Sequence, residues 1–169
     1  MITIQKLRET SVNILFLGSH PRIIQSMLDF DYLAGKTAPS VKAIIAGGKK
    51  FERSFFGKKE ILVPVFPTTS DLSKDLLGQI TYFFNTTSGR RVFESSSIAI
   101  ETIPHLIGGA IFAEDVPEIH ALSLLALAKK RGLFLLGPAS VGLLVPKYMK
   151  LGAIGGVDNR QLIASNVFT

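Results

Sequence analysis

Short polar segments carry the residues that could do chemistry in this chain, and each follows an apolar run. The first, Gly18-Ser19-His20 with Arg22, joins the run at 12–17 to an amphipathic segment that begins at Pro21. A glycine turn that opens a helix presents unpaired backbone N–H groups and the positive end of the helix dipole, which together favour an anion such as phosphate. The same turn is also compatible with an ordinary connection in which Ser19 caps the helix.

The second segment, Gly47-Gly48-Lys49-Lys50, follows the apolar run at 41–46. NAD-binding folds place an acid at this position to hold the ribose 2′-hydroxyl, whereas a phosphorylated ribose calls for cations. The lysines therefore favour a nucleotide with an extra ribose phosphate, such as NADP or coenzyme A (CoA). The alternative is a solvated hairpin face with no ligand.

The third segment, 85–91, is dense in hydroxyl and guanidinium groups for a loop after a buried strand. Arg90 could bind a phosphate through two nitrogens, which a lysine could not do. A serine or threonine here could equally cap the next helix. The candidate ligand-binding residues of the segment are Asn85, Thr86, Thr87, Ser88 and Arg90.

The fourth segment, Glu114-Asp115, precedes Pro117, and acids followed by proline are typical of a helix start. The rest of the sequence offers no complete catalytic constellation. It contains no G-x-x-x-x-G-K-[ST] loop, no G-x-S-x-G elbow, no cysteine, and three histidines without metal-ligand spacing. We therefore predict a domain that holds a ligand, with no catalytic residue and no metal site of its own.

Alternating apolar and amphipathic segments predict the elements that position these turns. The order is strand, helix, strand, hairpin, helix, strand, helix, strand, helix, strand, so we expect an α/β fold in which helices cover both faces of a parallel sheet in three layers. Ligands of such sheets bind at the carboxyl ends of the strands, where all four polar segments would meet. We expect strands at 12–17, 41–46, 80–84, 107–113 and 133–136, a hairpin arm at 51–66, helices from Pro21, at 69–77, 91–103 and through Arg131, and glycine-rich loops beyond Gly142.

Composition supports this fold. The 169 residues are 47% hydrophobic, with mean hydropathy +0.35, which suits a sheet buried on both faces. We expect a lead-in at 1–11 and a single domain at 12–169. The net charge of +6 implies an anionic partner. No apolar run is long enough to span a membrane, so we expect a cytoplasmic protein.

Several stretches resemble the CoA-binding domain of the succinyl-CoA synthetase α subunit, and more closely the matching region of ATP-citrate lyase and citryl-CoA synthetase. They are QSMLDFDY (25–32), APSV (38–41), GKKEILVPVF (57–66), AEDVPE (113–118), GPASVG (137–142) and KLGAIGG (150–156), followed by Asp158-Asn159. The first and third of these stretches point to the citrate branch. The chain departs from the family in its glycine-poor first turn and in Asp115, which replaces a glycine.

The resemblance implies a Rossmann-like domain that grips the nucleotide end of CoA. In the full enzymes an ATP-grasp partner binds ATP and Mg²⁺ and phosphorylates a histidine of a downstream domain, and citrate becomes citryl phosphate and then citryl-CoA. This chain lacks that histidine motif, so we expect a domain without turnover of its own. Its residues that match CoA contacts are Gly18, Ser19, His20, Arg22, Gly47, Gly48, Lys49, the loop from Asn85 to Arg90, Ala113, Glu114 and Asp115.

Two other functions remain open from the residues alone. An NADP-type dinucleotide-binding or redox-sensing domain would also use Lys49 and Lys50. A basic domain that binds nucleic acid is the third possibility. Against it, the cations accompany glycine turns at strand ends and do not follow one exposed helix.

Overall fold

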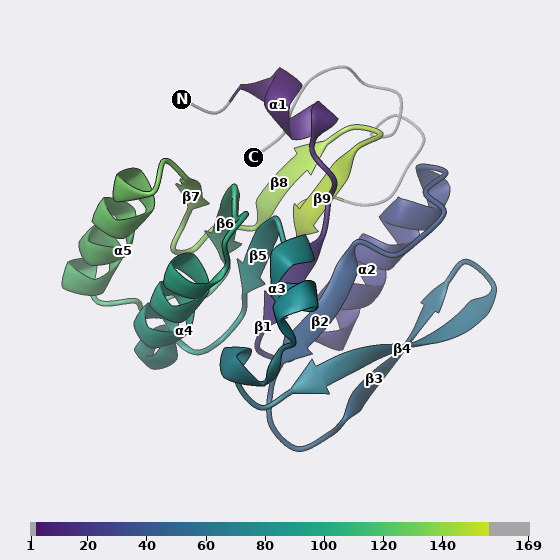
Figure 1. The fold of residues 1–169 in the computed structure, drawn as a ribbon, viewed down its shortest axis with the longest axis horizontal. Helices are drawn as coiled ribbons and strands as arrows, with labels where there is room; N and C mark the ends of the chain where they lie inside the picture. Colours follow the sequence, from purple (N-terminus) through teal and green to yellow (C-terminus); the bar gives the residue numbers. More distant parts are fainter. Residues whose placement is uncertain (1–2, 156–169) are drawn as a thin grey trace.

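The computed structural model describes residues 3–155, and its centre is a seven-stranded sheet of order β3-β4-β2-β1-β5-β6-β7 (Figure 1). All neighbouring strands in this sheet are parallel except β3 and β4, which form the antiparallel hairpin arm. The strands are β1 (Ile14–Leu17), β2 (Val41–Ile45), β3 (Phe51–Phe56), β4 (Lys59–Phe66), β5 (Tyr82–Asn85), β6 (Gly108–Ile111) and β7 (Phe134–Leu136).

Helices cover both faces of the sheet, as the sequence predicts. One face packs against α2 and the other against α3, α4 and α5, which gives the expected three-layer α/β architecture (Figure 1). The helical elements are α1 (Ile4–Glu9), α2 (Pro21–Leu33), the 3-10 turn η1 (Thr69–Asp71), α3 (Lys74–Gln79), α4 (Gly89–Thr102) and α5 (Glu118–Lys130). In the described part of the chain, every helix falls short of the length and hydropathy of a membrane span.

The central strand β1 shows why the apolar runs are unbroken. Ile14 and Phe16 belong to the core beneath α2, whereas Leu15 and Leu17 belong to the core beneath α4 and α5. None of the four side chains is more than 1% exposed. Because successive side chains of a strand point to opposite faces, a strand buried on both faces must be apolar at every position.

The prediction of glycine-rich loops beyond Gly142 is wrong. Strands β8 (Gly142–Val145) and β9 (Met149–Gly152) form an antiparallel hairpin, and their side chains join the core that α2 covers. Figure 1 shows this hairpin beside α2, over the part of the face that α2 leaves open. Gly156 and the residues after it lie outside the described residues.

Helix boundaries also differ from the expected ones. The segment at 69–77 divides into η1 and α3, because Ser73 accepts a hydrogen bond from the Leu76 amide (3.2 Å) and starts a new helix there. Pro117 lies at the cap of α5 and outside its first turn. The expected lead-in contains α1, whose cap Thr3 accepts a hydrogen bond from the Lys6 amide.

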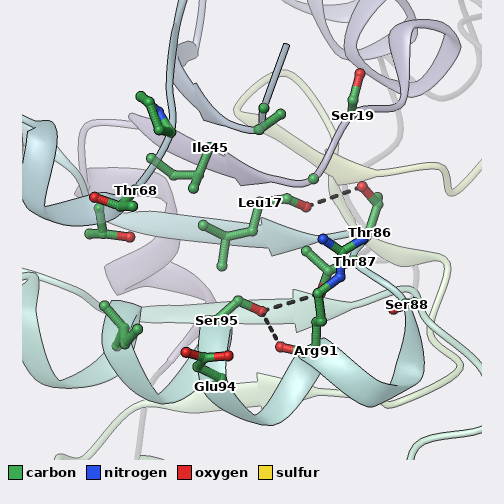
Figure 2. A pocket seen from close by; sticks show the side chains of 16 residues that line it. Leu17, Ser19, Ile45, Thr68, Thr86, Thr87, Ser88, Arg91, Glu94 and Ser95 are labelled. Carbon is green, nitrogen blue, oxygen red and sulfur yellow. Dashed lines mark hydrogen bonds between the residues drawn. The ribbon is translucent and has the colours of Figure 1, made fainter.

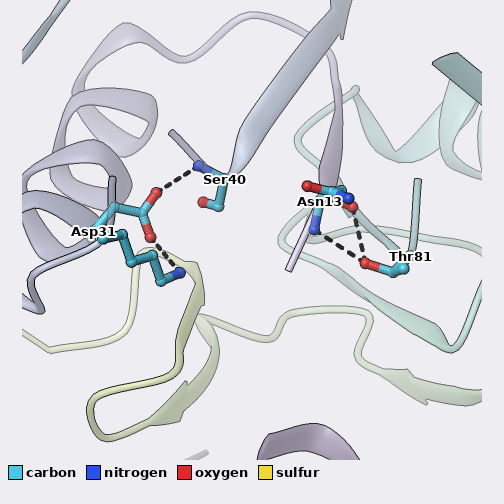
Figure 3. A network of polar contacts seen from close by, with 5 residues as sticks. Asn13, Asp31, Ser40 and Thr81 are labelled. Atoms are coloured by element: carbon cyan, nitrogen blue, oxygen red, sulfur yellow. Dashed lines mark hydrogen bonds and ion pairs between the residues drawn. The ribbon is translucent and has the colours of Figure 1, made fainter. Parts of the chain in front are cut away.

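A buried carboxylate ties the end of α2 to the start of β2 (Figure 3). Asp31, 1% exposed, accepts hydrogen bonds from the Ser40 amide (2.7 Å) and from Lys36 Nζ (2.6 Å). A buried carboxylate that lost these donors would be costly, so the network fixes how α2 lies on the sheet. By fixing the last turn of α2, this network also fixes where the first turn of the helix lies.

Candidate functional site

A cavity of about 510 Å³ opens at the carboxyl ends of β1, β2 and β5 (Figure 2). Its walls come from segments far apart in the sequence: 17–19, 45–47, 67–69, 86–88, and one side of α4 between residues 91 and 98. Three of the four polar segments singled out from the sequence contribute to it. The expected convergence at this edge of the sheet is therefore present for those three.

The first turn requires glycine at position 18. Gly18 has φ +95°, a conformation that residues with a side chain rarely adopt. A Cβ atom there would also lie 2.6 Å from Thr86 Oγ1. Thr86 in turn donates from its amide (2.8 Å) and its hydroxyl (3.1 Å) to the Leu17 carbonyl. The turns after β1 and β5 are therefore fitted closely to each other.

Asn85 fixes the loop after β5 through hydrogen bonds of its buried side chain. Its side chain is fully buried, donates to the hydroxyls of Ser95 and Ser96 (2.8 Å each), and accepts from the Thr87 amide (2.9 Å) and the Thr87 hydroxyl (2.7 Å). Asn85 was a candidate ligand contact, but it does not line the cavity. Its polar atoms fix the loop at 86–88 against α4.

The first turns of α4 supply the polar end of the cavity. Ser88 is the helix cap, and within residues 3–155 its side chain makes no capping hydrogen bond, so the hydroxyl can face a ligand. Figure 2 shows the guanidinium group of Arg91 reaching toward Thr86 and Thr87. Backbone N–H groups at a helix start also favour an anion at this end.

Part of the cavity lining is apolar. Leu17, Ile45, Pro67 and Ile98 contribute to it, and the carboxylate of Glu94 lines the cavity as well. A flat apolar group can pack against such a lining, and the carboxylate can accept a hydrogen bond from an amino group. A ligand that carries both a planar base and phosphate groups suits this mixed lining.

The structure divides the sequence candidates into two groups. Those that line the cavity are Gly18, Ser19, Gly47, Thr86, Thr87 and Ser88. Those that lie outside its lining are His20, Arg22, Gly48, Lys49, Asn85, Arg90, Ala113, Glu114 and Asp115.

Lys49 and His20 illustrate the second group. Lys49 forms an ion pair with Glu52, whose side chain is largely buried, so its ammonium group is engaged at the base of the arm. His20 packs edge-on against Phe112, with ring centroids 6.1 Å apart. Within the described residues its Nδ1 atom is buried without a hydrogen-bond partner.

The Glu114-Asp115 loop lies against the start of α4. A Cβ atom on Gly89 would come within 2.7 Å of the Glu114 carbonyl oxygen and 2.6 Å of the Asp115 carbonyl oxygen. Asp115 has φ +55°, so it keeps the left-handed backbone that a glycine adopts freely, and aspartate tolerates this conformation better than most residues. The loop supports the helix start and does not form the cavity wall.

Sequence reasoning missed the side of α4 that faces the cavity. Arg91, Glu94, Ser95 and Ile98 line it, at the i, i+3, i+4 and i+7 spacing of one helix face. This spacing was a usable signal once the helix start was placed at Gly89. Thr68 and Thr69 were also missed, because they lie in the connection after β4, which carried no motif.

No family model matches the chain, but curated proteins do. The probable ATP-citrate synthase subunit 1 of Schizosaccharomyces pombe is 36% identical over 154 residues, which cover 89% of this chain and 24% of that protein. The ATP-citrate synthase of Bos taurus is 34% identical over 156 residues, covering 89% of this chain and 14% of that protein. The chain thus spans a quarter or less of the length of these relatives.

Solved structures agree with the sequence relatives. The ATP citrate lyase of Methanothrix soehngenii, solved in complex with citrate and coenzyme A, superposes with a TM-score of 0.82 at 30% identity, covering 91% of this chain and 25% of that chain. The ATP citrate lyase of Methanosaeta concilii, in complex with (3S)-citryl-CoA, gives a TM-score of 0.77 at 30% identity over 84% of this chain and 23% of that one. The chain is therefore a homologue of one part of the longer ATP-citrate synthases and ATP citrate lyases.

Proposed function

We propose that the chain is the CoA-binding domain, residues 12–169, of a citrate–CoA ligase such as ATP-citrate lyase or citryl-CoA synthetase, and that the cavity holds the nucleotide end of CoA. The observation that carries the proposal is a homologue with the same fold that was solved with citrate and coenzyme A. The cavity lies at the carboxyl edge of the sheet, where such folds bind nucleotides.

In this proposal the adenine packs against the apolar lining of Ile45, Pro67 and Ile98, and its amino group faces Glu94. The phosphates face the hydroxyls at 86–88 and the first turn of α4, where the N–H groups and the helix dipole favour negative charge. Arg91 lines the cavity, and the neighbouring Arg90 is exposed at the same helix start. The guanidinium group of either arginine can donate hydrogen bonds to a ribose or pyrophosphate oxygen.

The chemistry of the full reaction belongs, in our proposal, to parts that this chain does not contain. The relatives are four to seven times longer than the matched segment, which leaves room for an ATP-grasp domain and a phosphohistidine domain. The role of the described residues is then to bind and orient CoA. We expect no turnover of citrate by the chain alone.

An NADP-type site is the alternative that the lysines after β2 suggested. Its main support weakens in the structure, because Lys49 is paired with Glu52 and does not line the cavity. Lys50 remains exposed beside it. We therefore favour CoA and keep NADP as a competing ligand in the experiment.

Isothermal titration calorimetry with CoA, 3′-dephospho-CoA, NADP and a short oligonucleotide tests the proposal. We expect CoA to bind more tightly than its dephospho form. A preference for NADP or for the oligonucleotide would overturn it.

A pair of variants locates the site. Arg90→Ala should weaken CoA more than Lys58→Ala, because Arg90 lies at the start of α4 whereas Lys58 lies at the far turn of the arm. Equal losses in the two variants would contradict the assigned loop. Thermal denaturation of both variants checks that neither loss reflects unfolding.

A further inference from the structure

Helix α5 has an apolar face that nothing in the described structure covers. Ile119, Leu122 and Leu125 are 68%, 56% and 44% exposed. The opposite side of the helix is apolar too, because Leu124 and Ala128 are buried against the sheet and α4. A helix that is apolar on both sides is typical of one that is packed on both sides.

Exposed residues of α5 also include Ile119, Ser123, Ala126 and Lys130, but four of the exposed positions form one line along the helix. Glu118, Leu122, Leu125 and Lys129 are exposed and recur at steps of four, three and four residues, which is the spacing of the contact positions of a helix pair. We call these four residues the α5 seam. None of them lines the cavity.

The seam is complementary to itself when it is reversed. It begins with an acid, ends with a base and has two leucines between them. In an antiparallel pair of identical helices, Glu118 of one copy would face Lys129 of the other, and Leu122 would face Leu125. A parallel pair would set Glu118 against Glu118 and Lys129 against Lys129, which is unfavourable.

We propose that the α5 seam is a contact between two copies of this chain, packed antiparallel about a two-fold axis that passes near the middle of α5. Such an axis brings the same patch of both copies together. Ala126 lies one turn after Leu122 on the exposed side and leaves space for the second helix to approach.

Contacts with α4 fix the position of α5 before the second copy binds. Arg131, just after α5, donates hydrogen bonds to the carbonyls of Ile100 and Ile103, so the end of α5 is fixed to the end of α4. His120 stacks on Phe93 of α4, with ring centroids 4.8 Å apart. A surface that is already ordered loses little conformational entropy when it binds.

The contact is small, which sets its expected strength. A helix of 13 residues is about 20 Å long, so one helix pair falls at the low end of protein interface sizes. We therefore expect a dimer that dissociates on dilution. Sedimentation velocity of the 169-residue chain over a concentration series should show a monomer–dimer equilibrium.

Matched leucine variants test the surface. Leu122→Glu should weaken dimerisation at least about 100-fold, because it removes two buried leucines and places two carboxylates in the contact. Leu62→Glu is the control, since Leu62 is 55% exposed, against 56% for Leu122, and lies on the hairpin arm. A chain that is monomeric at all concentrations, or a dimer that Leu122→Glu leaves intact, would overturn the proposal.

Cysteine cross-linking tests the antiparallel register, because the natural chain contains no cysteine. A mixture of Leu122→Cys and Leu125→Cys chains should form a mixed disulfide faster than either chain alone forms its own. The Leu62→Cys chain, with its thiol outside the seam, should cross-link slowly. Equal rates in all samples would overturn the antiparallel arrangement.

Discussion

Asn85→Ala should both destabilise the fold and weaken CoA binding, although Asn85 does not touch the cavity. The substitution removes four hydrogen bonds, two to serine hydroxyls and two from Thr87. At about 0.5 to 1.5 kcal/mol each, and with buried partners left unsatisfied, the loss is about 3 kcal/mol. Urea denaturation measures the free energy of unfolding.

The effect on the ligand follows from the loop. Thr87 would lose the acceptor of both its amide and its hydroxyl, so the segment 87–88 would be less ordered before CoA binds, whereas Thr86 keeps its hydrogen bonds to Leu17. The binding free energy must then include the cost of ordering that segment, about 1 to 2 kcal/mol per residue, so we expect CoA affinity to fall at least about tenfold. Calorimetry at a temperature where the variant remains folded measures it.

Asn13→Ala is the matched control. Asn13 lies at the other end of β1 and donates from its side chain to the exposed Gln79 carbonyl (2.9 Å). We expect a loss of about 1 kcal/mol or less and no change in CoA affinity. The reasoning would be refuted if Asn85→Ala cost less than 1 kcal/mol, or if it destabilised the fold while CoA bound as before.

Three further predictions concern backbone, charge and pH. Gly18→Ala should lower the free energy of unfolding, measured by urea denaturation, by about 2 kcal/mol or more, because φ at this position is +95°. The control is Gly78→Ala in α3, which should be neutral or stabilising because a Cβ there meets no described atom within 4 Å. Equal effects of the two substitutions would contradict this prediction. Lys36→Met should cost about 1 to 3 kcal/mol, since Asp31 stays buried with one donor fewer, and an unchanged urea midpoint would count against it. Burial raises the pKa of Tyr82 to about 12, so the folded state keeps this proton longer than the unfolded chain and its stability should fall between pH 10 and 12. Tyr82→Phe should remove about 1 kcal/mol of that loss at pH 11, and identical pH profiles of the two proteins would refute the assignment.

The alternation of strands and helices could be predicted because each central strand is buried on both faces. Leu15 and Phe16 face different layers, so β1 needs apolar residues throughout and stands out from the amphipathic helix that follows. The position of the site follows from the same pattern, because the carboxyl ends of parallel strands share one edge. Gly18 could be identified as a turn residue for this reason.

The hairpin of β8 and β9 could not be predicted in this way. Its turn places Lys147, and not a glycine, at φ +67°, so the usual turn signal is absent. Gly142 and Gly152 pair with each other across the hairpin, where their backbones approach the neighbouring strand or Phe84 closely. In the sequence these glycines indicate loops, because close approach depends on partners distant in the chain.

Individual site residues depend on side-chain partners that the sequence does not reveal. From the sequence alone, Lys49 could bind a ligand. In the structure it forms an ion pair with Glu52 of β3. Arg90 and Arg91 are adjacent, and only the helix phase set by the cap at Ser88 decides which of them lines the cavity. The phase of α4 could be read only after its first residue was known.

The two edges of the sheet bear on the solubility of this chain when it is made alone. Edge strands expose unpaired backbone groups and invite strand addition by another molecule, which is a route to aggregates. Here β7 is only three residues long, and β3 carries Glu52 facing inward and Arg53 paired with Glu60 on the outside. Short length and charge both disfavour growth of the sheet, so ordered self-association of this chain should proceed through helices and leave its seven strands unextended.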